Sequence, residues 1–294
     1  MSGRTLQGLA STPAHQVRRQ LLGLMTGLQK RARRHRLLVQ TVRSVRNLLH
    51  FGPWRPLALS YVRWMSPPRD EVADRPSILM SMIDPTVAVD ALERDGYFLG
   101  PRVCSDLVDQ SAGFWRNKGT GVYIDVHLQS EALARVANDP QLASIARAYF
   151  GAEPKMIECK LFISGANQED ELTTGFHFDH AGVRSLNVMV YLTSVDEDAG
   201  PHVLVSGSHR SKRLGDYLRE LTPIPEIERR FATRVRVITG PAGSILLENA
   251  EVFHRRLVAK RPRVAMIAVF STNGRRALSR GKDVRGPGAS RRSR

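Results

Sequence analysis

The sequence predicts a mainly β domain, a jelly roll or related β-sandwich, that is preceded and decorated by helices. The prediction rests on a change of pattern after Lys155, where apolar residues at helical spacing give way to short runs rich in Val, Ile, Leu and Phe. Gly, Pro, Asp and Asn separate these runs and interrupt strands. Six strands are expected, at 156–164, 185–193, 203–205, 234–238, 244–247 and 264–271.

Three helices are expected ahead of the strands. The first covers residues 87–96 and ends at a glycine, in a domain that begins near Pro85. The other two cover residues 132–137 and 141–150, and an Asn-Asp-Pro sequence separates them. Gly151 stands where a helix stop is expected, because glycine readily adopts the left-handed conformation that ends helices.

Length and cysteine content favour one domain in a reducing compartment. A chain of 294 residues can form one well-filled domain with appendages. Its two cysteines cannot build a disulfide framework, so a cytoplasmic location is expected. No apolar run reaches the roughly 18 residues of a spanning helix, and the N-terminus lacks the compact apolar core of a secretory signal.

The net charge of +16 resides at the two ends of the chain. Residues 1–69 contain 13 Lys and Arg and no Asp or Glu, while residues 275–294 contain eight basic residues and one acidic residue. The remaining stretch, 70–274, has 23 basic and 27 acidic residues, a net charge of −4. The basic character therefore describes the ends, and a nucleic-acid partner for the central domain is disfavoured.

The N-terminal segment has a basic amphipathic pattern over residues 16–49. Such a segment can lie on an anionic membrane, bind nucleic acid, serve as a transit peptide, pack on the domain as a helix or form a partly disordered extension. A proline-rich stretch at 53–76 indicates a linker. We thus expect an extension at 1–84, a folded domain at 85–273 and a basic disordered tail at 274–294.

A histidine and an aspartate separated by one residue, His177 and Asp179, predict part of a metal site. Residues two apart in an extended strand point the same way, so both side chains can reach one ion. His254, 75 residues after Asp179, can add a second imidazole. Two imidazoles and one carboxylate on one face are the ligand set of non-haem ferrous oxygenases, which leaves the other positions open.

Further landmarks surround these three residues in order: an acidic loop at 196–201, a Gly-Ser-His sequence within 206–210, a Gly-Pro-Ala-Gly-Ser sequence at 240–244, and Arg263. With them, residues 85–272 resemble the phytanoyl-CoA dioxygenase family. The resemblance implies a cupin-like double-stranded β-helix, iron held by His177, Asp179 and His254, and Arg263 paired with the distal carboxylate of 2-oxoglutarate.

Arg261 is a rival to Arg263. We prefer Arg263 because it directly opens the apolar run 264–270, whereas Arg261 precedes a proline and falls in the turn. Four residues could line the co-substrate or substrate pocket, and a packing role is an equal alternative for each: Lys160, Asn187, Met189 and Tyr191. For the remaining histidines we expect a structural role at position 209 and surface roles at His180 and His202.

Two positions depart from the family pattern. Ser206 stands where a proline usually precedes Gly-Ser-His, which alters a turn. Arg256 is larger than the small residue usual two positions after the last iron ligand. This arginine could crowd the co-substrate, or it could point outward and leave Arg263 as the anchor.

The family resemblance implies a dioxygenase that uses Fe(II), 2-oxoglutarate and dioxygen, releases succinate and CO2, and hydroxylates a small-molecule or lipid-type substrate. Asp179 favours hydroxylation, because halogenating relatives lack this carboxylate. The alternatives are a cupin-like metal-binding or regulatory protein without catalysis, and a nucleic-acid demethylase with the same iron chemistry. Peripheral contact with an anionic membrane through the N-terminal segment is a further expectation, whereas the prime substrate and the oligomeric state stay open.

Overall fold

The computed structural model describes residues 54–68 and 76–272, apart from residues 168, 170 and 180. These residues belong to one compact unit that spans 50–294. The predictions of a basic helix at 16–49 and of a disordered tail at 274–294 lie outside the described residues, as does His180. Among the helices that are described, none is long and apolar enough to cross a bilayer.

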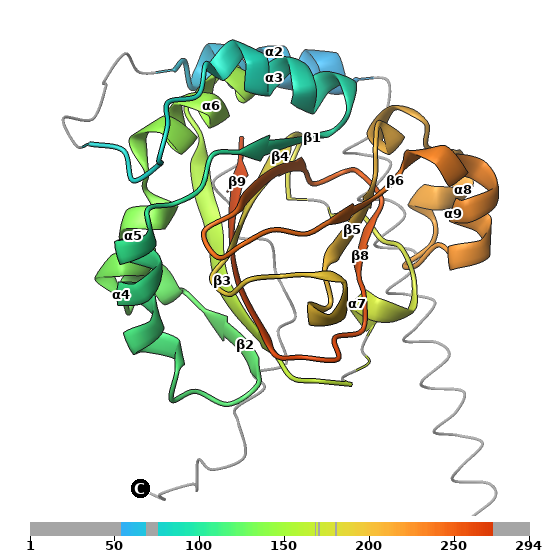
Figure 1. Ribbon diagram of the computed structural model, residues 1–294. Coiled ribbons are helices and arrows are strands. Elements are labelled where there is room, and N and C mark those ends of the chain that lie inside the picture. Colours follow the sequence, from blue (N-terminus) through green and yellow to red (C-terminus); the bar gives the residue numbers. More distant parts are fainter. Residues whose placement is uncertain (1–53, 69–75, 168, 170, 180, 273–294) are drawn as a thin grey trace, which may run out of the picture. The chain divides into compact units, whose positions relative to one another are not determined.

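Two antiparallel sheets form the core of the described part of the chain (Figure 1). The larger sheet has six strands in the order β1-β7-β4-β9-β3-β2, and the smaller has three in the order β6-β5-β8. This arrangement confirms the predicted jelly roll. The strand bounds are β1 Tyr97–Gly100, β2 Gly121–Ile124, β3 Lys155–Ser164, β4 Ser185–Tyr191, β5 His202–Val205, β6 Val235–Ile238, β7 Ile245–Asn249, β8 His254–Arg256 and β9 Arg263–Ser271.

Helices cover the outer face of the larger sheet, where residues of α3 to α6 share one apolar cluster with its strands (Figure 1). The α-helices are α2 Arg55–Met65, α3 Pro85–Arg94, α4 Ser105–Trp115, α5 Glu131–Ala137, α6 Pro140–Phe150, α7 Glu171–Thr174, α8 Leu214–Tyr217 and α9 Ile224–Phe231. Single 3-10 turns are η1 Val126–Leu128, η2 Glu197–Ala199, η3 Ser208–Arg210 and η4 Ala232–Arg234.

Each predicted helix and strand within the described residues is present, with ends shifted by at most two residues. Helix α6 illustrates why. The carboxylate of Asp139 accepts hydrogen bonds from the backbone N–H groups of Gln141 and Leu142, and Pro140 occupies the first turn, where no N–H partner is needed. Gly151 ends the helix at φ +61°, a left-handed conformation that glycine adopts without steric cost.

The prediction of a linker at 53–76 was wrong for residues 55–65, which form helix α2. Pro56 lies in the first turn of this helix and Pro67 lies beyond its end, so neither interrupts its hydrogen bonds. The guanidinium of Arg63 donates to the carbonyl of Phe150 at 3.0 Å, and Val62 packs against the apolar cluster of α3 to α6. Helix α2 is therefore part of the folded unit.

Alternation along the strands separates two apolar layers. On β4, Leu186, Val188 and Val190 contact the outer cluster with the helices, whereas Met189 and Tyr191 belong to a second cluster between the two sheets. All seven residues of β4 are buried, as expected for a strand covered on both faces. Inward-pointing residues of the larger sheet thus face the smaller sheet, which carries His254 on β8.

Candidate metal centre

A short backbone pairing places His177 beside His254. The N–H of His177 donates to the carbonyl of His254 at 2.9 Å, and the N–H of His254 donates to the carbonyl of His177 at 2.8 Å. Two residues further on, the N–H of Asp179 donates to the carbonyl of Ala250 at 2.7 Å. The segment around His177 thereby pairs with β8 at the edge of the smaller sheet. In such an extended segment His177 and Asp179 point the same way, so both can reach one metal ion.

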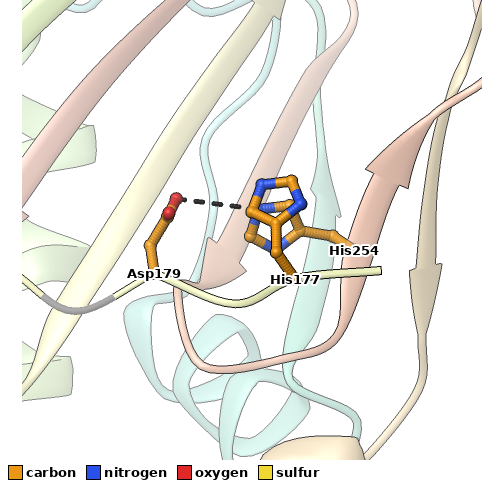
Figure 2. A group of neighbouring side chains, drawn as sticks. All are labelled: His177, Asp179 and His254. Carbon is orange, nitrogen blue, oxygen red and sulfur yellow. Dashed lines mark ion pairs between the residues drawn. The ribbon is translucent and has the colours of Figure 1, made fainter. Parts of the chain in front are cut away.

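Figure 2 shows the two imidazoles lying together with the Asp179 carboxylate across from them. Each of the three side chains has a nitrogen or oxygen atom that lies within 4.8 Å of such an atom in both of the others. Oδ2 of Asp179 lies 3.6 Å from Nε2 of His254, and the two ring centroids are 4.4 Å apart. The structure therefore brings the three predicted ligands together.

The donor set fits a ferrous ion. Two imidazole nitrogens and one carboxylate oxygen match the facial arrangement of non-haem iron sites. Burial, aided by the nearby His254, lowers the pKa of His177 to about 4, so this imidazole is neutral and its lone pair is available at neutral pH. Asp179 is exposed on the other side of the group, so its side chain can rotate to close the remaining distance.

Glu248 is a buried carboxylate behind His254 that the sequence did not reveal. Its Oε1 lies 3.4 Å from Nδ1 of His254 and 3.2 Å from Nε2 of His202. The surface role expected for His202 was wrong, because this side chain is buried and its ring lies 5.3 Å from that of His254. One signal in the sequence could have indicated Glu248: it is a charged residue two positions after Leu246, so it lies on the same inward face of β7.

Glu248 orients the His254 ring and favours its protonated form, so a metal that binds Nε2 would displace the proton from this nitrogen. Burial opposes a charge on His254, but Glu248 and Asp179 raise its pKa to about 9. Burial would likewise raise the pKa of Glu248, but His254 and His202 hold it below its usual value. Nδ1 of His254 also lies 3.1 Å from the carbonyl of Val252, so this nitrogen carries a proton and Nε2 is directed toward Asp179. Such a partner fixes which nitrogen binds a metal.

We expect Glu248→Gln to weaken Fe(II) binding by about 10- to 100-fold, the range for loss of a group that orients a ligating histidine. The amide keeps the size of the side chain but removes the charge that faces His254. An anaerobic Fe(II) titration measures the affinity. Glu153→Gln is the matched control, because Glu153 pairs with Arg147 at 3.1 Å away from this site and should leave iron binding unchanged. Equal affinity in both variants would contradict the assignment.

A search against models of known protein families finds no match for this chain. Among curated proteins, it is 27% identical over 171 residues to the ectoine dioxygenase of Bordetella parapertussis. That similarity covers 50% of this chain and 56% of the relative, so the chain spans little more than half the length of the protein it matches.

Solved structures match over a larger part of the chain. EctD from S. alaskensis, determined with 2-oxoglutarate and 5-hydroxyectoine, has a TM-score of 0.51 at 22% identity and covers 70% of this chain and 85% of its own. The epimerase SnoN, determined with Fe3+, alpha ketoglutarate and nogalamycin RO, has a TM-score of 0.54 at 18% identity and covers 70% and 92%. The fold is that of the 2-oxoglutarate-dependent oxygenases. The comparisons therefore confirm the fold that the motifs indicated.

Within this oxygenase fold, Arg263 and Arg261 have different surroundings. Arg263 is buried at the start of β9, and its Nη1 donates to the carbonyl of Gly200 at 2.6 Å. Its guanidinium also lies 5.9 Å from the ring centroid of Tyr191. Arg261 is exposed and forms an ion pair with Asp196 at the surface. Of these two arginines, Arg263 is the one that directs its charge into the interior, and its pairing with a co-substrate stays a prediction.

Arg256 also lies in the interior, so the expectation that it could point outward was wrong. Its side chain is buried, and Nη1 donates to the hydroxyl of Ser164. Ser164 is the neighbour of Arg263 across β3 and β9. The buried Arg256 guanidinium thus contacts the residue that is paired with Arg263, and a guanidinium group is well suited to bind a carboxylate. The alternative that Arg256 crowds the co-substrate stays open.

The four predicted pocket residues are distributed along the inner faces of β3 and β4. The hydroxyl of Tyr191 donates to the carbonyl of Ile238 at 2.8 Å and accepts from the N–H of His202 at 3.1 Å, and its place in the pocket stays a prediction. Met189 joins the same inner apolar cluster, and Lys160 pairs with Glu158 on its own strand at 2.8 Å.

Asn187 is the pocket candidate that lies nearest to the metal group in the strand register. It stands directly opposite Glu248 across β4 and β7. Its side chain is buried, and Oδ1 has no hydrogen-bond partner among the described residues. A buried amide oxygen of this kind is suited to accept a hydrogen bond from a bound ligand. His209, by contrast, contacts the carbonyl of Glu93 at 3.0 Å, in keeping with its predicted structural role.

Proposed function

We propose that this protein is a non-haem Fe(II)- and 2-oxoglutarate-dependent dioxygenase that hydroxylates a small-molecule or lipid-type substrate. The observation that carries the proposal is the convergence of His177, Asp179 and His254 inside an oxygenase fold. The buried Arg263, nine residues after His254, supports it, because a planar guanidinium pairs well with the carboxylate of a dicarboxylic co-substrate.

The residues have distinct tasks in this proposal. His177, Asp179 and His254 would hold the iron, which supplies dioxygen activation, so that 2-oxoglutarate is oxidised to succinate and CO2 while a substrate C–H bond becomes C–OH. Glu248 keeps His254 in the orientation that presents Nε2. Arg263 would fix the distal carboxylate of 2-oxoglutarate. Because Asp179 occupies the third ligand position, hydroxylation is favoured over halogenation.

The competing functions predict different behaviour. A cupin-like protein without catalysis would bind a metal but would not convert 2-oxoglutarate. A nucleic-acid demethylase would need a basic catalytic domain to grip phosphates, whereas residues 70–274 carry a net charge of −4. We propose a small-molecule or lipid-type partner for the domain, and peripheral contact with an anionic membrane for the basic N-terminal stretch.

The first test is spectroscopic. Under anaerobic conditions, we expect Fe(II) and 2-oxoglutarate together to give a weak visible charge-transfer band, because the keto acid chelates the metal through its open positions. The band should be absent in Asp179→Ala. After addition of oxygen and candidate metabolites, succinate should form and a product should gain one oxygen in mass. A protein that binds iron but yields neither the band nor succinate would be the metal-binding alternative.

A further inference from the structure

Helix α2 presents an apolar, aromatic side to solvent. Leu57, Tyr61, Trp64 and Met65 recur at helical spacing and share one face, and their exposed fractions are 74%, 60%, 76% and 58%. Trp54, directly before the helix, is exposed as well. Single exposed apolar residues are ordinary on protein surfaces, but four on one face of an 11-residue helix indicate a contact surface.

The opposite side of α2 is anchored to the domain, so the apolar side is held outward. Arg55 forms a two-pronged ion pair with Glu251, in which Nη1 lies 2.9 Å from Oε2, and its Nε donates to the carbonyl of Val183 at 3.1 Å. In the last turn of α2, the guanidinium of Arg63 donates to the carbonyl of Phe150 at 3.0 Å. The aromatic face therefore belongs to a fixed helix.

The charge of the surrounding sequence indicates what this face contacts. Helix α2 lies within residues 1–69, which contain 13 basic residues and no acidic residue. Trp and Tyr concentrate where a bilayer meets water, since one part of each ring system is apolar and another is polar. Basic side chains next to such residues are attracted by the negative potential of anionic lipid headgroups.

We propose, in an inference that rests on the membrane contact proposed above, that α2 is a membrane-docking helix whose Leu57, Tyr61, Trp64 and Met65 enter the headgroup region of a bilayer that contains anionic lipids. The basic residues of the acid-free stretch 1–69 add electrostatic attraction to the headgroup phosphates. A second copy of the chain would bring a second acid-free stretch with 13 basic residues, and repulsion between the two like-charged stretches makes it the weaker candidate. The docked face would keep the catalytic unit beside a membrane.

Vesicle binding by the full-length chain tests the proposal. Wild-type protein should sediment with vesicles of phosphatidylcholine and phosphatidylglycerol and bind far less to phosphatidylcholine alone. Leu57→Ser/Trp64→Ser should bind the anionic vesicles at least about 10-fold less tightly, because it removes two large apolar side chains from the docked face. The matched control is Leu128→Ser/Leu214→Ser, at positions that are 74% and 70% exposed, and it should bind as wild type does.

Tryptophan emission separates the possible occupants of this face. The chain has three tryptophans, of which Trp54 and Trp64 lie at α2. Emission should shift to the blue on addition of anionic vesicles, and brominated lipids should quench it. Equal vesicle binding by the double variant and wild type would overturn the proposal. A dimer that the double variant abolishes would also overturn it, because a second copy would then cover the face. The same holds if the emission is already blue without lipid and shifts to the red when residues 1–53 are deleted, because this segment would then cover the face.

Discussion

Replacing any one of His177, Asp179 and His254 by alanine should abolish turnover while the protein stays folded. Loss of a group that merely orients a ligand weakens metal binding by about 10- to 100-fold, so loss of a ligand should weaken it further. Without iron there is no centre to activate dioxygen. Metal analysis of the purified variants, together with 2-oxoglutarate consumption and circular dichroism, measures the three quantities that matter: iron content, turnover and folding.

Asp179→Ala is the most informative of these variants, because Asp179 is exposed and its side chain adds little to the core. Asp109→Ala, which removes another exposed carboxylate from helix α4, is the matched control and should behave as wild type. Near-normal iron content and 2-oxoglutarate consumption in Asp179→Ala would show that the three residues are not the ligands. Failure of the control would instead indicate a general loss of folding.

Arg263→Ala should raise the concentration of 2-oxoglutarate needed for half-maximal turnover by roughly 30-fold or more. Breaking a buried, hydrogen-bonded charge pair costs about 2 to 5 kcal/mol, and each 1.4 kcal/mol is about a tenfold change in affinity. Iron binding should change little, since Arg263 is not among the three residues that converge as ligands. Turnover at varied 2-oxoglutarate and a separate iron titration distinguish the two effects.

Arg261→Ala is the control for this experiment. Its guanidinium pairs with Asp196 at the surface, and an exposed pair of this kind contributes little to stability. A normal 2-oxoglutarate requirement in Arg263→Ala together with a strongly raised one in Arg261→Ala would reverse the assignment. A similar rise in Arg256→Ala would show that both buried guanidinium groups bind the co-substrate.

The regular elements could be predicted because local signals were strong. Strand β9 is an uninterrupted apolar run, and α6 carries both an N-terminal cap at Asp139 and a stop at Gly151. Elements without such signals were missed. Strand β8 has three residues, two of them arginines, and it exists because it pairs with β5 and with the segment around His177. Helix α2 was missed because prolines surround it, although neither Pro56 nor Pro67 occupies its interior.

The convergence of the three candidate ligands could be predicted because one short motif supplies two of them and a family resemblance supplies the third. The residues that surround these candidate ligands could not be predicted. Glu248 and His202 lie 46 residues apart in the chain and meet only through the packing of β7 against the smaller sheet. The direction of the Arg256 side chain was ambiguous for the same reason, because it is held by the hydroxyl of Ser164, which is 92 residues away in the chain. Long-range side-chain contacts of this kind leave no local pattern in a single sequence.

The turn between β7 and β8 connects helix α2 with the three candidate metal ligands. Within it, the carbonyl of Ala250 holds the backbone of Asp179, while the adjacent side chain of Glu251 holds Arg55 of α2. The residue that anchors α2 is thus the neighbour of the residue whose carbonyl positions the backbone of Asp179. Arg55 and Asp179 are therefore held by two consecutive residues of one turn, and a shortened chain must begin before Arg55 to retain the contact between α2 and this turn.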